Sequence, residues 1–229
     1  MLPQKMFALL PSLFAAAQVF AVSVYEPFSY PVGDLGRQGG WVLTAGTSPK
    51  VQAGSLAVPG LMPATDGNSL VFGNSQMEVR RFMKNEAEVI FGTPGAEFDG
   101  QYWYSLAFKV TDLGSLNTNG DFIAAFSSTN QTSEYGGLLY LRKDPLGTPN
   151  GYNIGVSKDA SAAVDIAWSS TVYLTGQTNF VVCRYHTTGP EDTLLWINPD
   201  PSTYGAAVGS EPPPTLTASS GLNLLAKVG

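Results

Sequence analysis

Apolar residues occupy every even position of segment 101–110. These positions hold Tyr102, Tyr104, Leu106, Phe108 and Val110. A repeat of two residues is the repeat of a β-strand, so this face is expected to point into the protein core. The odd face carries Trp103 and Lys109 between small residues, which is typical of a strand face that is partly covered or lines a groove. We interpret the segment as a central strand of a sheet sandwich.

Other segments of the chain are also predicted to be short strands. They are 41–44, 55–58, 68–72, 76–83, 121–127, 136–142 and 152–156. In 121–127, Phe122, Ala124 and Phe126 are expected on one face, and the charges on both faces of 76–83 indicate an edge strand or a solvated face. Gly, Asn, Pro and Asp separate the segments about every 10 to 25 residues, which is the rhythm of an antiparallel sandwich.

Segments 179–187 and 192–198 form the clearest predicted hairpin, because a short loop with Gly189 and Pro190 joins them. Cys183 lies in the first of these strands, and we expect it to be a buried small hydrophobic residue. His186 follows three residues later and should therefore lie on the opposite strand face. This spacing excludes a simple Cys/His catalytic pair within the strand.

The composition narrows the class of protein. The chain has 229 residues, of which 44% are hydrophobic and 13% charged, with 25 glycines and 16 prolines. This turn-rich composition suits a single all-β domain of this length. The formal net charge is -6 and no run of Lys or Arg exceeds two residues, which disfavours a nucleic-acid partner. The single cysteine excludes an internal disulfide.

Residues 1–21 have the layout of a secretory signal peptide. Lys5 precedes an apolar run over 6–20, and Val19, Phe20 and Ala21 form a plausible cleavage site. The alternative is a membrane anchor, but the run is shorter than the ~20 residues of a spanning helix. We expect cleavage after Ala21. The sequence thus predicts a secreted or cell-surface protein, with one domain over 22–229 and no membrane contact after signal removal.

Several short patterns resemble one known family. They are the opening 24–35, the GGW at 39–41, the element 55–61, the YWYSL at 102–106 and the LWINP at 195–199. Together they resemble bacterial exported proteins with a concanavalin A-like, or LamG-like, domain, many of which end in a PEP-CTERM-type sorting tail. The resemblance implies an all-β concanavalin A-like jelly-roll sandwich of two antiparallel sheets. It spans nearly all of 25–229, but through packing and turn patterns.

The resemblance also suggests that the C-terminus is truncated. Members of the family usually continue into a final strand, whereas segment 222–229 looks only like the beginning of one. We therefore expect the last strand and any sorting tail to be missing. A missing strand exposes the backbone donors and acceptors of its neighbour, so an open sheet edge is predicted, with possible self-association through it.

No catalytic residue can be assigned from the sequence. Glycoside hydrolases on this fold use paired carboxylates, and the nearest pair, Glu97 and Asp99, lies between glycines with no third acid after it. A single histidine excludes a multi-His zinc site and a second base for a serine triad. We expect neither enzyme activity nor a metal site, although calcium remains possible in the oxygen-rich loop 112–121, which lacks EF-hand spacing.

Carbohydrate binding requires an exposed aromatic ring with amide or guanidinium groups nearby. Trp103 and Trp196 lie in the middle of predicted strands, which favours a core role. Trp168 stands in a more polar setting, so it is the first candidate for a sugar platform. Its predicted companions, if they share its face, are Tyr135, Arg142 and Asn153.

The predicted function is therefore recognition of a glycan or extracellular polysaccharide, or adhesion, without catalysis. Two alternatives stay open. One is a structural surface protein that associates with itself through an open sheet edge. The other is a divergent glycoside hydrolase or polysaccharide lyase on the same fold.

Overall fold

A computed structural model gives the structure of the protein. It describes residues 25–58, 60–61, 67–73, 76–81, 101–114, 116–127, 135–159, 165–186, 192–207 and 209–219. The predicted signal peptide, the acids Glu97 and Asp99, the hairpin loop at Gly189 and the C-terminal segment 222–229 lie outside these residues. Within the described ranges, no helix has the length and hydropathy needed to cross a membrane.

Strands make up nearly all of the regular structure. They are β1 (Gly33–Asp34), β2 (Val42–Gly46), β3 (Lys50–Ala53), β4 (Asn68–Val71), β5 (Met77–Arg80), β6 (Gln101–Lys109), β7 (Asp121–Ser127), β8 (Tyr135–Lys143), β9 (Gly151–Ser157), β10 (Ala167–Trp168), β11 (Tyr173–Leu174), β12 (Thr178–His186), β13 (Thr193–Ile197) and β14 (Leu216–Ala218). A short 3-10 helix, η2 (Pro201–Thr203), follows β13. The all-β prediction is confirmed.

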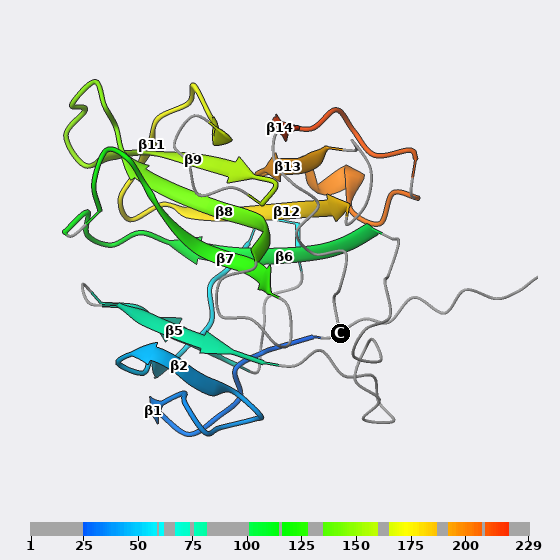
Figure 1. Ribbon diagram of the computed structural model, residues 1–229. Coiled ribbons are helices and arrows are strands. Elements are labelled where there is room, and N and C mark those ends of the chain that lie inside the picture. The colour runs from blue at the N-terminus through cyan, green and yellow to red at the C-terminus, as the bar shows by residue number, and fades with distance from the viewer. Residues whose placement is uncertain are drawn as a thin grey trace, which may run out of the picture.

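Two antiparallel sheets form the body of the protein (Figure 1). The five-stranded sheet has the order β10-β9-β8-β7, with β11 also paired to β9, and the four-stranded sheet has the order β14-β13-β12-β6. Their facing sides share one hydrophobic core. Its fully buried members include Leu139, Ile154, Val156, Val181 and Leu195. This arrangement is consistent with a β-sandwich.

The alternation of β6 works as predicted. Tyr104, Leu106 and Phe108 pack against the shared core, and the hydroxyl of Tyr104 donates to Gly137 O at 2.8 Å. Burial raises the pKa of Tyr104 well above its ordinary value. β6 pairs with β12 along its whole length. It was expected to be a central strand, but it stands at the end of the strand order in the described part of the sheet.

The predicted hairpin is confirmed by the antiparallel pairing of β12 with β13. Cys183 is 0% exposed, and burial raises the pKa of its thiol to about 12, so it behaves as the expected small core residue. His186 lies on the other face of β12 and ends the strand opposite Gln101. The two side chains therefore point to opposite faces of β12, so Cys183 and His186 do not form a catalytic pair within this strand.

Two predictions about strands were wrong. Segment 55–58 forms no strand. The strand precedes it as β3, which ends at Ala53, and the next residue, Gly54, has a φ of 94°, outside the extended region. In β7, Phe122 does not share a face with Ala124. The pairing of β7 with β8 shifts register between these residues, so Ala124 contacts the shared core while the Phe122 ring lies 6.2 Å from Tyr140 on the outside.

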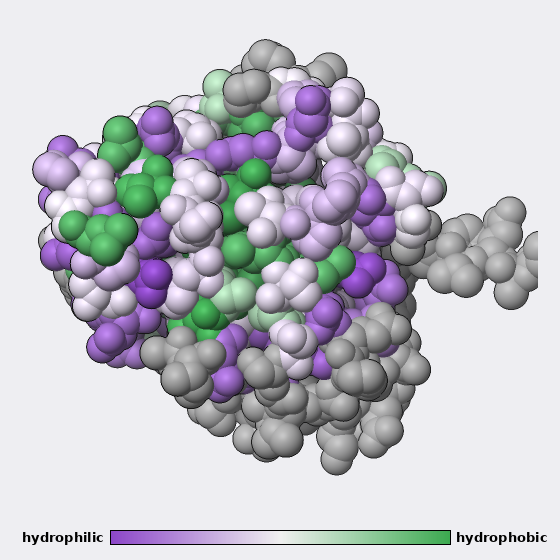
Figure 2. All heavy atoms as spheres, turned by 90° about the horizontal axis from the view of Figure 1, so that it is seen from above, coloured by the Kyte–Doolittle hydropathy of each residue, from purple (hydrophilic) through white to green (hydrophobic). Residues whose placement is uncertain are grey.

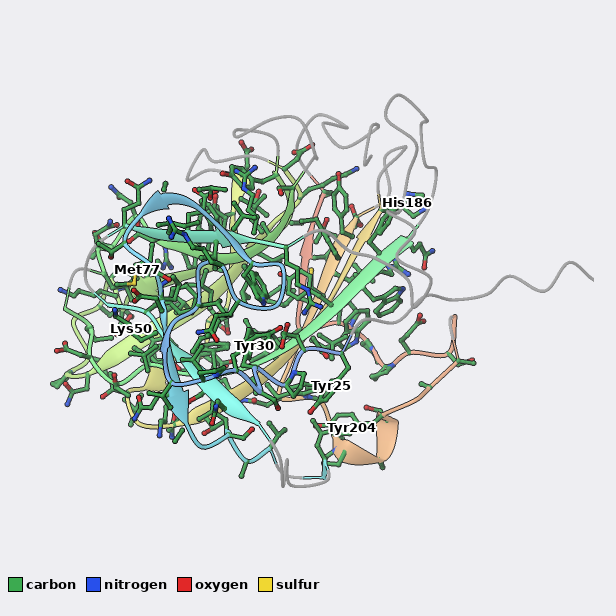
Figure 3. The ribbon with its side chains drawn as sticks, turned by 90° about the horizontal axis from the view of Figure 1, so that it is seen from below. Tyr25, Tyr30, Lys50, Met77, His186 and Tyr204 are labelled. Atoms are coloured by element: carbon green, nitrogen blue, oxygen red, sulfur yellow. The ribbon has the colours of Figure 1, made fainter. Side chains whose placement is uncertain are left out.

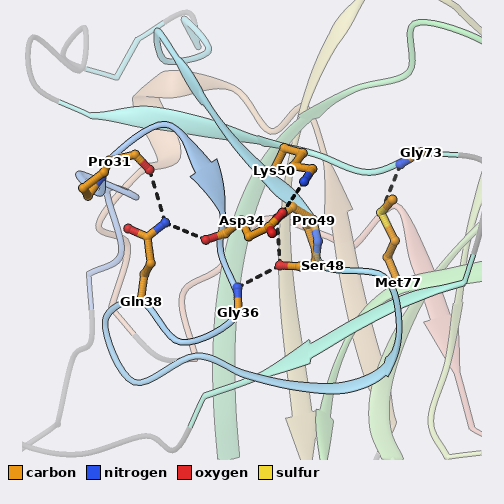
Figure 4. A network of polar contacts seen from close by, with 9 residues as sticks. All are labelled: Pro31, Asp34, Gly36, Gln38, Ser48, Pro49, Lys50, Gly73 and Met77. Carbon is orange, nitrogen blue, oxygen red and sulfur yellow. Dashed lines mark hydrogen bonds and ion pairs between the residues drawn. The ribbon is translucent and has the colours of Figure 1, made fainter.

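Residues 25–81 supply two smaller sheets, β1-β3-β4 and β2-β5, and Figure 1 shows β1, β2 and β5 below the sandwich. Polar contacts tie the turns of these sheets together (Figure 4). Gln38 Nε2 donates to Asp34 O at 2.6 Å, Gly36 N donates to Ser48 Oγ at 2.8 Å, and Lys50 pairs with the Asp34 carboxylate. In the described part of the chain β5 pairs with β2 and no other strand, which agrees with the predicted edge character of segment 76–83.

Candidate functional site

Trp168 lies on the outer face of the five-stranded sheet, half-buried. A Cβ built on its cross-strand partner Gly155 would lie 2.6 Å from Trp168 Cε3, so the indole packs directly onto the glycine backbone. The guanidinium carbon of Arg142 lies 4.3 Å from the centre of the Trp168 ring. The ring therefore sits between the sheet and a cation, rather than standing open to solvent.

Asn153 holds this arginine in place. The two residues are direct partners in the β8–β9 ladder, and Arg142 Nε donates to Asn153 Oδ1 at 3.4 Å. Asn153 is only 3% exposed, and its Nδ2 donates to Thr171 O at 3.1 Å, so both ends of its amide are used within the protein. Asn153 is thus placed to orient Arg142, and within the described residues no ion pair engages the terminal guanidinium nitrogens of Arg142.

The fourth predicted residue, Tyr135, lies on the same outer face but elsewhere. Gly137, with a φ of 60°, accompanies a register shift between β7 and β8 that turns Tyr135 outward. There it meets β5: Arg80 donates to the Tyr135 hydroxyl at 2.9 Å, and that hydroxyl donates to Glu78 at 3.2 Å. Tyr135 therefore links β5 to the sandwich: its ring packs against the same small hydrophobic core as Trp168, while its hydroxyl bonds to Arg80 and Glu78.

The middle of this outer face is closed. Leu138, Tyr140 and Ile166 are 3%, 4% and 7% exposed, and they form a second small hydrophobic core with Trp168 packed against it. Hydrophobic burial stabilises this cluster in the same way as the main core. The face therefore offers Arg142 at its margin rather than a broad open platform.

The outer face of the four-stranded sheet carries a different aromatic pair. Trp103 and Trp196 stack with ring centroids 5.5 Å apart and an angle of 17° between the planes. Trp196 is 4% exposed, and its Nε1 donates to Pro212 O at 2.7 Å, whereas Trp103 is 37% exposed. The core role expected for Trp103 was wrong, because the odd face of β6 points outward. The polar and small neighbours of Trp103 along that face were the available signal.

Polar groups surround the Trp103 ring. Arg184 is its direct partner on β12, with the guanidinium carbon 6.0 Å from the ring centre. Gln101 and Ser105 lie two residues to either side on the same face of β6 and are exposed.

Figure 3 shows His186 at the opposite end of the molecule from Lys50 and Met77, and it pairs with Gln101 across the ladder.

The candidate calcium loop uses its oxygens to build turns. Asp112 Oδ1 accepts from Gly114 N at 2.7 Å, and Asn117 Oδ1 accepts from Asn119 N and Gly120 N at 2.7 and 2.8 Å. In the ranges that the structure describes, no group of three or more His, Cys, Asp or Glu side chains is placed to hold a metal ion. Calcium binding thus stays a prediction without a defined ligand set.

Exposed apolar residues alone do not define the site. The face seen in Figure 2 mixes hydrophobic and hydrophilic residues, as most protein surfaces do. The two outer clusters are distinguished instead by geometry, since each combines a tryptophan held in one orientation with an arginine. We name them the Trp168 cluster (Trp168, Arg142, Asn153) and the Trp103 cluster (Trp103, Trp196, Arg184).

Comparisons with known proteins identify no relative. No protein family, no curated protein and no solved structure matches the chain. Function therefore has to be argued from the clusters themselves.

Proposed function

We propose that the protein is an exported, non-catalytic glycan-recognition module on a concanavalin A-like jelly roll of the LamG-like, PEP-CTERM-associated type. The observation that carries the proposal is the exposed ring of Trp103, fixed by stacking on buried Trp196. Sugars present a C–H face that packs on an indole, and hydroxyls that need hydrogen-bond partners.

The Trp103 cluster meets both needs. Stacking and the bond from Trp196 Nε1 to Pro212 O set the orientation of the indoles before any ligand arrives, which lowers the entropy lost on binding. Arg184, Gln101 and Ser105 bring donors and acceptors to the rim of the ring. This arrangement suits a neutral or mixed polysaccharide.

A glycan-array screen of the purified protein, with and without calcium, tests the proposal. Trp103→Ala is expected to weaken binding about tenfold or more, because a stacked aromatic contact contributes ~1.5 kcal/mol. Trp168→Ala is the matched variant on the other sheet and is expected to leave this binding unchanged. Loss in the Trp168 variant alone would move the site to the predicted residues on the five-stranded sheet. Silence on all glycans would contradict the function.

A second candidate function is self-association through a sheet edge. β6 and β14 stand at the two ends of the four-stranded sheet as far as the structure describes it, and an end strand offers backbone groups to another chain. Sedimentation equilibrium at increasing protein concentration tests this. A monomer throughout would remove the candidate, whereas dimers or polymers would favour a structural role at the cell surface.

A further inference from the structure

The Trp168 cluster holds a cation in one orientation. Arg142 stacks over the Trp168 ring at 4.3 Å and donates through Nε to Asn153, which is itself buried and bound to Thr171 O. A guanidinium fixed on one side in this way presents its terminal nitrogens in a planar fork. Such a fork matches the two oxygens of a carboxylate.

No carboxylate of the described residues forms an ion pair with this fork. The nearest acid in the chain, Asp144, is 6% exposed, and its two oxygens accept hydrogen bonds from Leu146 N at 3.2 Å, from Thr148 N at 3.1 Å and from the Thr148 hydroxyl. Asp144 therefore directs its hydrogen bonds to the turn after β8, and it acts on Arg142 through its charge rather than through an ion pair. As far as the structure describes the chain, the cation is therefore partly desolvated without a counter-ion in contact.

Partial burial has a consequence for binding. Desolvation lowers the pKa of Arg142 from its ordinary value, which reports that its charge is less well solvated than in water. An anion that replaces the lost water would be stabilised by the charge and by two parallel hydrogen bonds. Arg142 is partly buried, stacked on Trp168 and bonded to the buried Asn153, so its guanidinium is pre-organised to contact an anion.

We propose that the Trp168 cluster is a second binding site, which takes the carboxylate of an acidic sugar such as a uronate. The choice of a sugar as the carrier of this carboxylate rests on the proposed glycan function. It also agrees with the neighbouring aromatic surface, where Phe122 is 40% exposed beside Tyr140. The two sites lie on the outer faces of opposite sheets, so one molecule can hold a neutral segment and an acidic segment of matrix polysaccharide.

Calorimetric titration with a galacturonate tetramer and with its carboxyl-reduced counterpart tests this site. The acidic tetramer is expected to bind at least tenfold more tightly than the reduced one. Arg142→Lys keeps the charge but loses the planar fork, and it should abolish most of this preference. Asn153→Ala should reduce it as well, by releasing Arg142. Thermal unfolding of each variant shows whether the fold is kept.

The control is Arg81→Lys, at an arginine that pairs with Glu26 and lies outside both clusters. It should leave the preference for the acidic tetramer unchanged. Equal affinity for the two tetramers, or an unchanged preference in Arg142→Lys, would overturn the site. Binding of a glutamate-rich peptide in place of the tetramer, lost in the same variant, would overturn the sugar and identify a peptide ligand. If no neutral glycan binds on the array but the acidic tetramer binds with the expected preference, only the Trp103 platform is rejected.

Discussion

The outer faces of the two sheets use the same pair of residue types with opposite results. On the five-stranded sheet, Trp168 lies half-buried beneath Arg142 at 4.3 Å. On the four-stranded sheet, Trp103 is 37% exposed, with Arg184 at 6.0 Å from its ring centre. A tryptophan and an arginine on neighbouring strands therefore do not by themselves specify an exposed sugar platform.

The residue beside each indole explains the difference. Trp168 has Gly155 as its cross-strand partner, and the absence of a side chain lets the ring sink onto the sheet and leaves room for Arg142 above it. Trp103 instead stacks on Trp196, which is itself buried and bonded to Pro212 O. Beside Gly155, the indole lies on the sheet and Arg142 stacks over it. Beside Trp196, the indole of Trp103 stays exposed.

The largest expected effect comes from removing the support of the exposed ring. Trp196→Ala should lower the free energy of unfolding by ~3–5 kcal/mol, since it deletes a buried aromatic side chain. Urea unfolding measures this. Trp196→Phe is the control: it keeps an aromatic contact and loses the hydrogen bond to Pro212 O, at a cost of about 1 kcal/mol for that bond. A loss below 1 kcal/mol in the alanine variant would show that the stack is not structural.

A smaller effect is expected from filling the space under Trp168. In Gly155→Ala the new methyl group would lie 2.6 Å from Trp168 Cε3 and 2.9 Å from Ile166 Cγ2, so the indole must move outward. The free energy of unfolding should fall by ~1–3 kcal/mol, and the tryptophan emission should shift to the red. Ser105→Ala on the other sheet should stay within ~0.5 kcal/mol. An unshifted spectrum and unchanged stability would contradict the proposed packing.

The link between Tyr135 and β5 should depend on pH. Burial acts to raise the pKa of Glu78, but the hydrogen bonds from Arg80 and others outweigh it and the pKa is lowered. The stabilisation, about 1 kcal/mol, is therefore complete above the unfolded pKa of about 4.3 and is lost as pH falls through the folded pKa. Glu78→Gln should remove this part of the acid dependence in urea unfolding between pH 7 and pH 3. An identical pH profile in the variant would reject the link.

The smallest expected effect compares the two arginines directly. Arg142→Lys should cost ~0.5–1 kcal/mol of unfolding free energy, since Arg142 lies close over its ring, and Arg184→Lys should cost less at the longer distance. Parallel thermal melts of the two variants measure the difference. Equal losses would mean that the two clusters do not differ in the strength of their cation–aromatic contact.

Much of the sandwich was predictable because its signals are local. The even face of β6, the inward face of β9 with Tyr152, Ile154 and Val156, and the burial of Cys183 follow from a two-residue repeat. The hairpin of β12 and β13 follows from two apolar runs joined by a short loop. A jelly-roll connection remains a proposal, since it concerns the order of strands across the whole chain.

The candidate sites were predictable only in their parts. The sequence suggested Trp168, Arg142 and Asn153 as partners, and the ladder of β8, β9 and β10 brings these three together. It did not reveal that Arg142 covers the indole or that Tyr135 contacts β5 instead. The exposure of Trp103 was also missed, because a mid-strand position does not tell which face another segment covers.

The sequence by itself determined which residues alternate into the core, because neighbouring side chains of a strand point to opposite faces whatever lies around them. Tertiary structure decided what each outer face became. The register shifts beside Phe122 and Gly137 changed which residues share a face, and Gly155 and Trp196 decided which indole is covered. These outcomes depend on contacts between strands distant in the chain, and no local repeat encodes such contacts.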